Sequence, residues 1–356
     1  MFVQSIVFYY FCKVSISKSH ITIHDLAKEL NISASTVSRA LHNNPRVSTK
    51  TIQKVQDLAK KYNYQPNQMA ASLRKGRGNT IGVIVPNINR SFFSNIIGGL
   101  EEVFAAAGYN LMICQSHEKL EKEKKAIQTL LNARVDGILM SLSMETRNTD
   151  HLKEVYEQVR MLFFDRVPLT DMVDSIRIDD YTAAYDLVLH LMESGYKKIA
   201  HIRGATHINV YSERTRGYIT AIRDLNLAEN REWVFEEEMT IAGGERAFDK
   251  LRTLTDPPDA ILCSGDFAAL GVINAARKNG IQVPQKLGVT GFANETFTEF
   301  ITPSITTVHQ KGAELGRTAA ELYLKRVNNN PELNNHENFV IGPELIFRGS
   351  TRRGEQ

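Results

Sequence analysis

The chain has 356 residues, of which 42% are hydrophobic and 23% charged. This composition is typical of a globular protein with a sizeable core, and the length suits two or three domains rather than one. The three cysteines, Cys12, Cys114 and Cys263, lie far apart and form no C-x-x-C pair. Their spacing argues against a zinc site and a disulfide framework, and it fits a reducing cytosol.

The net charge of +3 conceals a difference between the two ends of the chain. Residues 1–80 contain twelve Lys or Arg against three Asp or Glu, a net charge of +9, whereas the remaining residues carry −6. A basic head on an acidic body is typical of a nucleic-acid-binding module joined to another domain. Because phosphate contacts release counterions, we expect the affinity for nucleic acid to fall steeply with salt.

The first nineteen residues open with the apolar and aromatic run MFVQSIVFYYF. The run is too short to span a bilayer, and it lacks an opening cationic cluster and an A-x-A cleavage site. We therefore expect neither a signal peptide nor a membrane anchor, and we predict a cytoplasmic protein. Two interpretations of these residues stay open: a disordered extension, or an upstream start site taken for the true one.

Residues 22–41, TIHDLAKELNISASTVSRAL, predict two short helices joined by a tight turn. Thr22 is a good N-cap, with Asp25 placed to face the amide dipoles. Asn31 stands where the chain must reverse, and Asn is among the non-glycine residues that best adopt a positive φ. The apolar positions of the first helix follow helical spacing: Ile23, Leu26, Ala27 and Leu30.

The second helix is predicted to begin after its cap, Ser33, and to bury Val37, Ala40 and Leu41. Its other positions are small or polar with one long cation: Ala34, Ser35, Thr36, Ser38 and Arg39. Such a face suits the major groove of DNA, where small residues allow close approach and Arg39 reaches a phosphate or guanine. An ordinary helical hairpin with a solvated face is the alternative.

A third helix is predicted after Ser48, with the apolar stripe Ile52, Val55, Leu58, Ala59 and Tyr62. Three helices within about forty residues suit a helix-turn-helix domain. Pro66 then blocks continuation of the third helix, and Asn67 is able to cap a short further helix, residues 68–73. A helix of two turns is marginal in water, so this one needs a partner in order to form; a plain linker is the alternative.

From Thr80 the periodicity changes to short apolar runs that alternate with helical stretches. The predicted strands are TIGVIVP, YNLMICQ, VDGILMS, RMLFFD, KIAHIRG, DAILCSG, LGVTGF and SITTVHQ. The predicted helices between them include residues 92–107, 121–133, 181–193, 213–224 and 243–254. Strands that alternate with helices indicate parallel sheets covered on both faces.

Ligands of such sheets bind beyond the carboxyl ends of the strands. The polar and aromatic candidates near strand ends are Asn89, Phe92, Phe93, Asp165, Arg214, Asp266 and Asn294. Carboxylates and Arg hold vicinal hydroxyls, and an aromatic face covers a sugar ring. Alternatives stay open for three kinds of residue: the two phenylalanines as a core stripe, Asp165 as a strand-end ion pair with Arg166, and Asp266 as the cap of the following helix.

Motifs of the common enzyme classes do not occur in the chain, among them G-x-x-x-x-G-K-[ST], G-x-G-x-x-G, H-E-x-x-H and G-x-S-x-G. The ten histidines are scattered. We therefore expect no enzymatic activity, no cofactor and no metal. An exported sugar-binding protein of the periplasmic type is the alternative function, but it would need an export signal and would have no use for a basic three-helix head.

The run TI-x-D-x-A…S-x-x-TVSRAL…VS-x-x-T…YNYQPN…A-x-x-L resembles the head of the LacI/GalR family of bacterial transcription regulators. The resemblance implies an all-α helix-turn-helix head and an α/β body with two lobes of periplasmic-binding-protein type, built on parallel sheets. By position, Ala34, Ser35 and Arg39 would read bases, while Thr22, Thr36 and Ser38 would hold phosphates. The predicted DNA-binding set also includes Arg46, Asn67 and Leu73, the last as a wedge in the minor groove.

The resemblance also implies an effector site between the lobes. Arg214 falls on the ligand-gripping arginine of the family in the pattern E-R-x-x-G-Y. Three positions depart from the family: Asn31 replaces the usual glycine, Ala71 an arginine, and Ala293 a carboxylate of the G-[FY]-D-[DN] pattern. The loss of that carboxylate removes one hydroxyl acceptor, and the effector class that remains is a small polar molecule, a sugar or sugar phosphate.

We therefore predict a repressor that binds a pseudo-palindromic operator as a homodimer and responds to a small effector. The predicted domains are an extension (1–19), a DNA-binding domain (20–65), a hinge helix and linker (66–78) and an effector-binding and dimerisation domain (79–356). Within the last, the first lobe covers about residues 79–178 and the second about 179–309, and the tail contributes to both. No heptad pattern follows the core, which favours a dimer.

Overall fold

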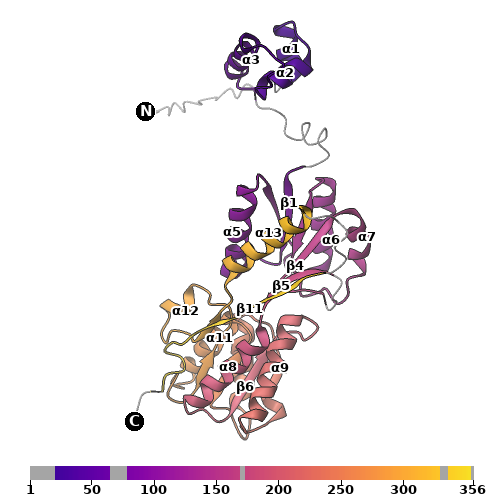
Figure 1. The fold of residues 1–356 in the computed structure, drawn as a ribbon. Helices are drawn as coiled ribbons and strands as arrows, with labels where there is room; N and C mark the ends of the chain where they lie inside the picture. The colour runs from indigo at the N-terminus through magenta and orange to yellow at the C-terminus, as the bar shows by residue number, and fades with distance from the viewer. Residues whose placement is uncertain (1–20, 65–77, 169–172, 329–335, 354–356) are drawn as a thin grey trace, which may run out of the picture. The chain divides into compact units, whose positions relative to one another are not determined.

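The computed structural model describes residues 21–64, 78–168, 173–328 and 336–353. The chain forms two compact units, Met1–Gly76 and Arg77–Gln356 (Figure 1). The predicted hinge helix, with Asn67 and Leu73, lies outside the described residues, as do residues 1–19. The predicted domain boundaries therefore stay predictions. No helix in the described part of the chain is long and apolar enough to cross a membrane.

The head consists of α1 (Ile23–Glu29), α2 (Ala34–Leu41) and α3 (Thr49–Lys61). Each helix begins at its predicted cap, because the side chains of Thr22, Ser33 and Ser48 each accept the backbone N–H three residues later. Asn31 has a φ of 49°, which confirms the predicted left-handed turn. The head is closed by a small core of fully buried residues, Leu26, Val37, Ala40 and Val55.

Tyr62 was predicted in the apolar stripe of the third helix, and that prediction is wrong. The residue follows α3 as its C-cap and is 38% exposed. Its hydroxyl donates to Glu29 Oε1 at 3.0 Å, so the phenol stays at the surface where its polar end finds a partner.

The first lobe of the body is built on a six-stranded parallel sheet of order β11-β5-β4-β3-β1-β2. Its strands are β1 (Thr80–Val85), β2 (Asn110–Gln115), β3 (Gly137–Met140), β4 (Arg160–Phe164), β5 (Asp174–Ile178) and β11 (Asn338–Ile341). The helices of this lobe are α5 (Ser91–Ala106), α6 (Leu120–Asn132), α7 (Lys153–Gln158) and α13 (Gly312–Asn328). The strand order reverses between β1 and β3, and a ligand crevice is expected beyond their carboxyl ends.

The second lobe has a four-stranded parallel sheet of order β7-β6-β8-β9 and an antiparallel pair, β10-β12. Its strands are β6 (Ile199–Arg203), β7 (Val234–Glu236), β8 (Ala260–Cys263), β9 (Gly288–Thr290), β10 (Thr307–His309) and β12 (Glu344–Ile346). Its helices are α8 (Asp180–Glu193), α9 (Asn209–Asp224), α10 (Ile241–Arg252), α11 (Asp266–Lys278) and α12 (Phe297–Phe300). These parallel sheets with helices confirm the predicted α/β class.

The chain passes between the lobes three times. It leaves the first lobe after β5, returns from β10 into α13, and leaves again from β11 to β12. Figure 1 shows α13, in orange, beside α5 although more than two hundred residues separate them in the chain. A single apolar cluster contains residues of both lobes, among them Phe104 of α5 and Leu262 of β8. The core is therefore continuous across the two lobes.

The pair of α5 and α13 approaches closely because glycines stand at the contact. A Cβ atom added at Gly99 would lie 2.2 Å from the carbonyl oxygen of Ala313, and one at Gly316 would lie 2.2 Å from that of Ile96. Backbone atoms cannot yield to such an overlap as the end of a flexible side chain can. Gly98, next to Gly99 on α5, has nothing within 4 Å of its added Cβ.

We therefore expect Gly99→Ala to lower the stability of the body by about 1–3 kcal/mol, because it overpacks a helix contact. The matched variant Gly98→Ala should raise stability by about 0.5–1 kcal/mol, because alanine favours the helix and meets no neighbour. Urea unfolding followed by far-ultraviolet circular dichroism measures both. Equal midpoints for the two variants would contradict the close contact between α5 and α13.

Candidate functional site

The outer face of α2 in the head is polar and exposes two of its predicted DNA contacts. Ser35 and Arg39 are exposed, whereas Thr36 and Ser38 are half-buried. The hydroxyls of Ser35 and Thr36 each lie 2.8 Å from Ser33 Oγ, so both also support the helix cap. Ala34 was predicted to point away from the core, and it instead packs against the core of the head.

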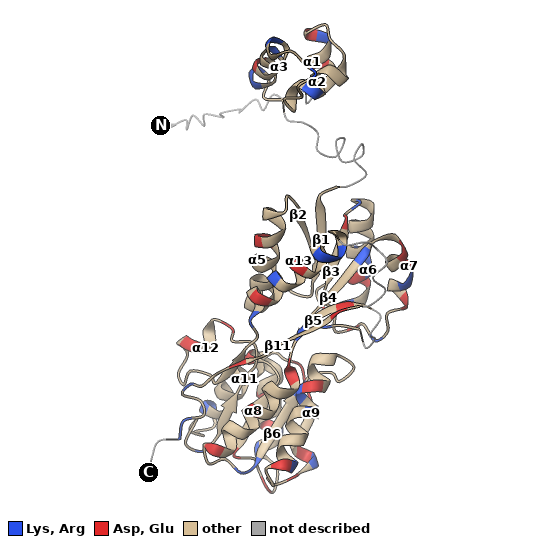
Figure 2. Cartoon of the chain, viewed as in Figure 1, with Lys and Arg blue, Asp and Glu red and all other residues tan. Residues whose placement is uncertain are grey.

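The head also carries unpaired positive charge. Arg39 and Arg46 are exposed, and neither forms an ion pair within residues 21–64 and the other described ranges. Thr22 is exposed as well, and its hydroxyl lies 2.6 Å from Asp25 Oδ2 within a capping box. Figure 2 shows both signs on the head as on the body, but residues 21–64 carry seven Lys or Arg against three Asp or Glu. A face of this kind can contact phosphates without first breaking ion pairs.

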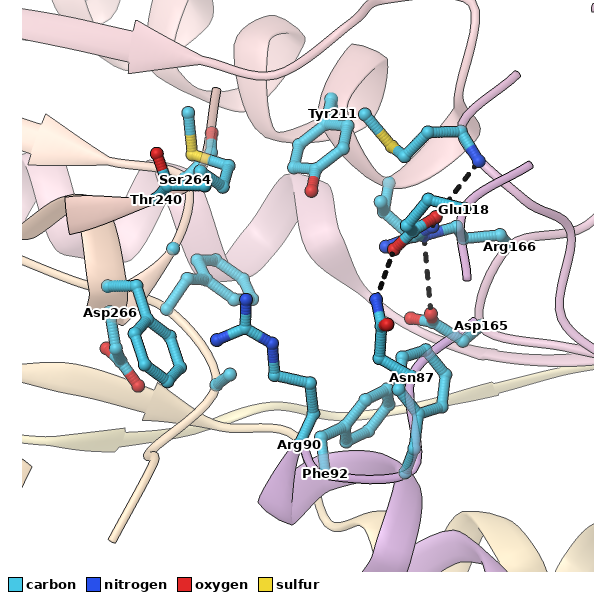
Figure 3. Close-up of a pocket in the computed structure, with 18 of the residues that line it drawn as sticks. Asn87, Arg90, Phe92, Glu118, Asp165, Arg166, Tyr211, Thr240, Ser264 and Asp266 are labelled. Carbon is cyan, nitrogen blue, oxygen red and sulfur yellow. Dashed lines mark hydrogen bonds and ion pairs between the residues drawn. The ribbon is translucent and has the colours of Figure 1, made fainter. Parts of the chain in front are cut away.

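The body contains a cavity of about 540 Å³ between its lobes (Figure 3). Residues after β1, β4, β8 and β9 line it, as do the first turns of α5, α9 and α11. Five of the predicted effector residues line this cavity: Phe92, Phe93, Asp165, Arg214 and Asp266. The sequence did not single out several other lining residues: Asn87, Arg90, Glu118, Tyr211, Ser264 and Glu295.

Two predicted effector residues do not line the cavity. Asn89 is exposed in the turn before α5, and Asn87 takes its place, with its amide donating to Glu118 Oε1 at 3.2 Å. Asn294 has a φ of 52°, and its side-chain oxygen accepts from Arg348 Nη1 at 3.0 Å, so it is bound to the tail of the chain instead. Its neighbour Ala293 does line the cavity.

Phe92 and Phe93 serve both of the roles left open by the sequence. Both are buried, with 7% and 4% of their surface exposed, and both belong to the apolar cluster that continues across the lobes. Their rings lie 5.3 Å apart between centroids and also border the cavity. Aromatic rings held in this way offer a rigid apolar wall to a ligand.

Arg214 lies in the second turn of α9, which begins at Asn209, four residues before the predicted start. Its Nε donates to Asp180 Oδ1 at 2.7 Å, and its Nη1 donates to the carbonyl oxygen of Ser264 at 2.9 Å. The guanidinium also lies 3.5 Å from the centroid of the Phe292 ring. These contacts fix the direction of the buried cation before any ligand binds.

Burial raises the pKa of the Asp180 carboxyl to about 7, although the positive charge of Arg214 opposes the shift. Burial likewise raises the pKa of Asp165, which has a φ of 60° at the end of β4. The ion pair of Asp165 with Arg166 is long, 4.0 Å from Oδ2 to Nε. The short partner of Arg166 is Glu118, whose Oε2 lies 2.6 Å from Nη1.

Asp266 is not the cap of α11; Gly265 stands there without a side-chain bond. The Asp266 carboxylate accepts the N–H of Glu295 at 2.7 Å and the hydroxyl of Thr307 at 2.6 Å. Burial raises its pKa to about 6, and these two hydrogen bonds oppose the shift. Its position is thus fixed by neutral donors rather than by a cation.

Two buried polar atoms at the cavity have no hydrogen-bond partner: Ser264 Oγ and Arg166 Nε. Buried polar groups are rarely left unpaired, since the lost hydration costs free energy. Ser264 Oγ can therefore bond to a polar ligand that reaches it, whereas Arg166 Nε belongs to a guanidinium that already pairs with Glu118. No group of His, Cys, Asp or Glu within the described ranges is arranged to hold a metal ion.

Contacts between the lobes flank the cavity. The side-chain amide of Asn209 donates to the carbonyl oxygen of Asp165 and accepts the N–H of Val167, both at 3.0 Å. Ser91 Oγ donates to Glu295 Oε2 at 2.7 Å. These contacts join α9 to the end of β4 and the start of α5 to the segment after β9, in addition to the apolar cluster that the two lobes share.

Comparison with known proteins adds the following matches. The profile of bacterial regulatory proteins of the lacI family matches residues 22–67, and that of the periplasmic binding protein-like domain matches residues 188–351. The chain is 32% identical over 331 residues to the HTH-type transcriptional repressor PurR of Histophilus somni, covering 93% of this chain and 99% of PurR. It is also 32% identical to the HTH-type transcriptional repressor CytR of Escherichia coli, covering 93% and 96% of the two chains.

Solved structures agree with these matches. The lac repressor dimer bound to operator and the anti-inducer ONPF aligns with a TM-score of 0.82 over 94% of this chain and 99% of that one, at 23% identity. This likeness is one of fold. The transcription regulator CcpA of Lactococcus lactis aligns with a TM-score of 0.69 at 29% identity, over 76% and 98% of the two chains.

We expect Arg214→Met to destabilise the second lobe by about 3–5 kcal/mol at neutral pH, because it leaves a buried carboxylate unpaired. In this variant the pKa of Asp180 stays above its unfolded value, so the loss is small near pH 4 and grows as pH rises through the folded pKa. The single tryptophan, Trp233, is 1% exposed in the second lobe and reports unfolding by fluorescence.

The double variant Asp180→Asn/Arg214→Met is the control, since it removes the Asp180 carboxylate and keeps Asp165, the other carboxylate that Arg214 acts on, as in the single variant. Its stability relative to the native chain should change much less between about pH 5 and pH 8 than that of the single variant. Identical pH profiles for the two variants would show that Asp180 does not carry the effect.

Proposed function

Because the chain belongs to the lacI family of bacterial regulatory proteins, we propose that it works as a homodimer whose heads bind the two halves of a pseudo-palindromic operator and whose cavity binds a sugar or sugar phosphate. Like its relatives, the chain is a transcriptional repressor that binds operator DNA and a small-molecule effector, and it is not an enzyme. Since it acts on chromosomal DNA, the proposal includes a cytoplasmic location.

On the DNA side, α2 enters the major groove. Arg39 and Ser35 are exposed there and support base contacts, with Ala34 close by at the start of the helix. Phosphate contacts are assigned to Thr22, Thr36, Ser38 and Arg46. Asn67 and Leu73, outside the described residues, complete the proposal as the cap of a hinge helix and its wedge in the central minor groove.

On the effector side, the observation that carries the proposal is the cavity between the lobes, with aromatic walls and polar groups that point into it. Tyr211, Phe92 and Phe292 offer ring faces, while Arg214 and Asp165 offer charged hydrogen-bonding groups. Two structural neighbours at 24% identity, the regulator CelR in complex with cellobiose and a LacI family regulator of Enterococcus faecium with bound ribose, suggest the first probes. A sugar suits both the aromatic and the polar groups, since it has an apolar ring face and many hydroxyls.

The effector acts by a shift of population. It touches residues of both lobes, so it binds one interlobe angle more tightly than another, and only that difference in affinity can change operator binding. The contacts of Asn209 and Ser91 across the lobes are the ones that such a change of angle would break.

Arg39→Gln should weaken binding to a selected operator by about 1–3 kcal/mol, because the variant loses a charged contact to a base or phosphate. The operator is first selected from a random duplex library, and fluorescence anisotropy then gives the affinity at several salt concentrations. Arg252→Gln, an exposed change on α10 of the body, is the matched control and should leave binding unchanged. Equal affinities for the two variants would show that Arg39 of α2 does not contact the operator.

Ser264→Ala should weaken effector binding by about 0.5–1.5 kcal/mol without destabilising the fold, since Ser264 Oγ has no partner in the protein. Ser116→Ala is the control, because that hydroxyl is also buried and unpaired but does not line the cavity. Calorimetric titration with ribose, cellobiose and related sugars measures the change. If Ser264→Ala binds as the native chain does, Ser264 Oγ does not contact the effector.

A further inference from the structure

We infer that the effector carries no phosphate or other anionic group, and that the cavity selects an uncharged or amine-bearing polyhydroxyl molecule. This inference rests on the proposed function and narrows it. A protein ordinarily binds phosphate at the N-termini of helices and at Arg or Lys side chains that have no partner. In this cavity, charged side chains already occupy places of both kinds.

Carboxylates already stand at three helix N-termini beside the cavity. Glu295 Oε2 accepts the N–H of Ser91, the first residue of α5, at 3.1 Å. Glu145 Oε2 accepts the N–H of Leu120, the first residue of α6, at 3.1 Å. The first residue of α11 is itself acidic, Asp266. A phosphate at any of these helix ends would meet a negative charge at close range.

The other two helix starts beside the cavity do not offer an anion site either. The first turn of α9 presents the side chains of Val210 and Tyr211 to the cavity. The start of α10 is closed by its own cap, since Thr240 Oγ1 accepts the N–H of Gly243 at 3.0 Å.

The basic side chains of the cavity are similarly engaged. Arg166 pairs with Glu118, Arg214 with Asp180 and Lys119 with Glu145, each at 2.6–2.7 Å. Among the described basic residues that line the cavity, only Arg90 has no ion pair, and its guanidinium lies 3.8 Å from the centroid of the Phe267 ring. Six carboxylates line the cavity against four cations: Glu118, Glu145, Asp165, Glu238, Asp266 and Glu295. Three of the six, Glu118, Glu145 and Glu238, are themselves ion-paired, but the surplus of negative charge still leaves a dianion with one unpaired cation among these lining residues.

The same groups suit hydroxyls and ammonium groups. Carboxylate oxygens accept hydrogen bonds from both, and Ser264 Oγ can donate or accept. The wall of Phe92 and Phe93 covers the apolar face of a ring. The cavity is therefore rich in acceptors and poor in free positive charge, which is the opposite of a phosphate site.

Matched compounds test the inference: ribose with ribose 5-phosphate, glucose with glucosamine and glucose 6-phosphate, and inorganic phosphate alone. Thermal unfolding, followed by Trp233 fluorescence, and calorimetry measure binding to the full chain. We expect each phosphate ester to bind roughly tenfold or more weakly than its parent sugar, and inorganic phosphate to show no saturable binding. A phosphate ester that binds more tightly than its parent, or saturable phosphate binding that Arg90→Gln abolishes, would overturn the inference.

Glu295→Gln identifies the group that excludes anions. Its amide oxygen still accepts from Ser91, so the fold is kept, and the loss of charge should raise the affinity for the phosphate esters by several-fold. Glu299→Gln, on α12 and outside the cavity, removes the same charge and should leave their affinity unchanged. Equal behaviour of the two variants would contradict the role given to the carboxylate at α5.

The two proposals fail in different ways. If no sugar of any charge binds while inorganic phosphate also shows no saturable binding, the sugar class is wrong but the exclusion of anions is supported. If phosphate esters bind and neutral sugars do not, the cavity is an effector site and the exclusion of anions is wrong.

Discussion

The contact between Arg214 and Asp180 holds the second lobe in the form that the cavity requires. Asp180 begins α8, Arg214 lies on α9, and the same guanidinium donates to the carbonyl oxygen of Ser264, just after β8. A buried guanidinium is stable only with its charge paired and its N–H groups bonded, so these elements are constrained together. The Phe292 ring lies next to the cation and lines the cavity.

A second constraint acts between the lobes. Single contacts such as those of Asn209 and Ser91 are each worth about 0.5–1.5 kcal/mol, which is small beside the burial energy of either lobe. An effector that prefers one angle by a few kcal/mol can therefore outweigh them and leave each lobe intact. The stiff parts of the body are its two sheets, and the part that can change is the junction between them.

Local patterns predicted the head well because a helix cap involves residues only three positions apart, as Thr22 and Asp25 show. The α/β class of the body was predicted, but short strands such as β5 and β7 were missed. Strands of three to five residues that include polar positions give little periodicity. The tail strands β11 and β12 have only four and three residues, and each is defined by pairing with a distant strand.

The residues of the cavity could likewise be predicted only where a local pattern marks them. Arg214, Asp165 and Asp266 were predicted because each lies on a recognisable pattern or follows a strand. Glu295 was missed, since its role depends on Ser91, which lies 204 residues away in the chain. The choice between Asn87 and Asn89 depends on the dihedral angles of one turn, which no neighbouring residue dictates.

The return of the tail to the first lobe has a consequence for synthesis. On the ribosome, β1 to β5 and their helices emerge early, but α13, which covers α5, and β11, which completes the sheet edge, follow only after the whole second sheet. A nascent first lobe therefore exposes an apolar helix face and an open strand edge while the second lobe is being made. The first lobe can therefore close completely only after residues 312–341 have been made.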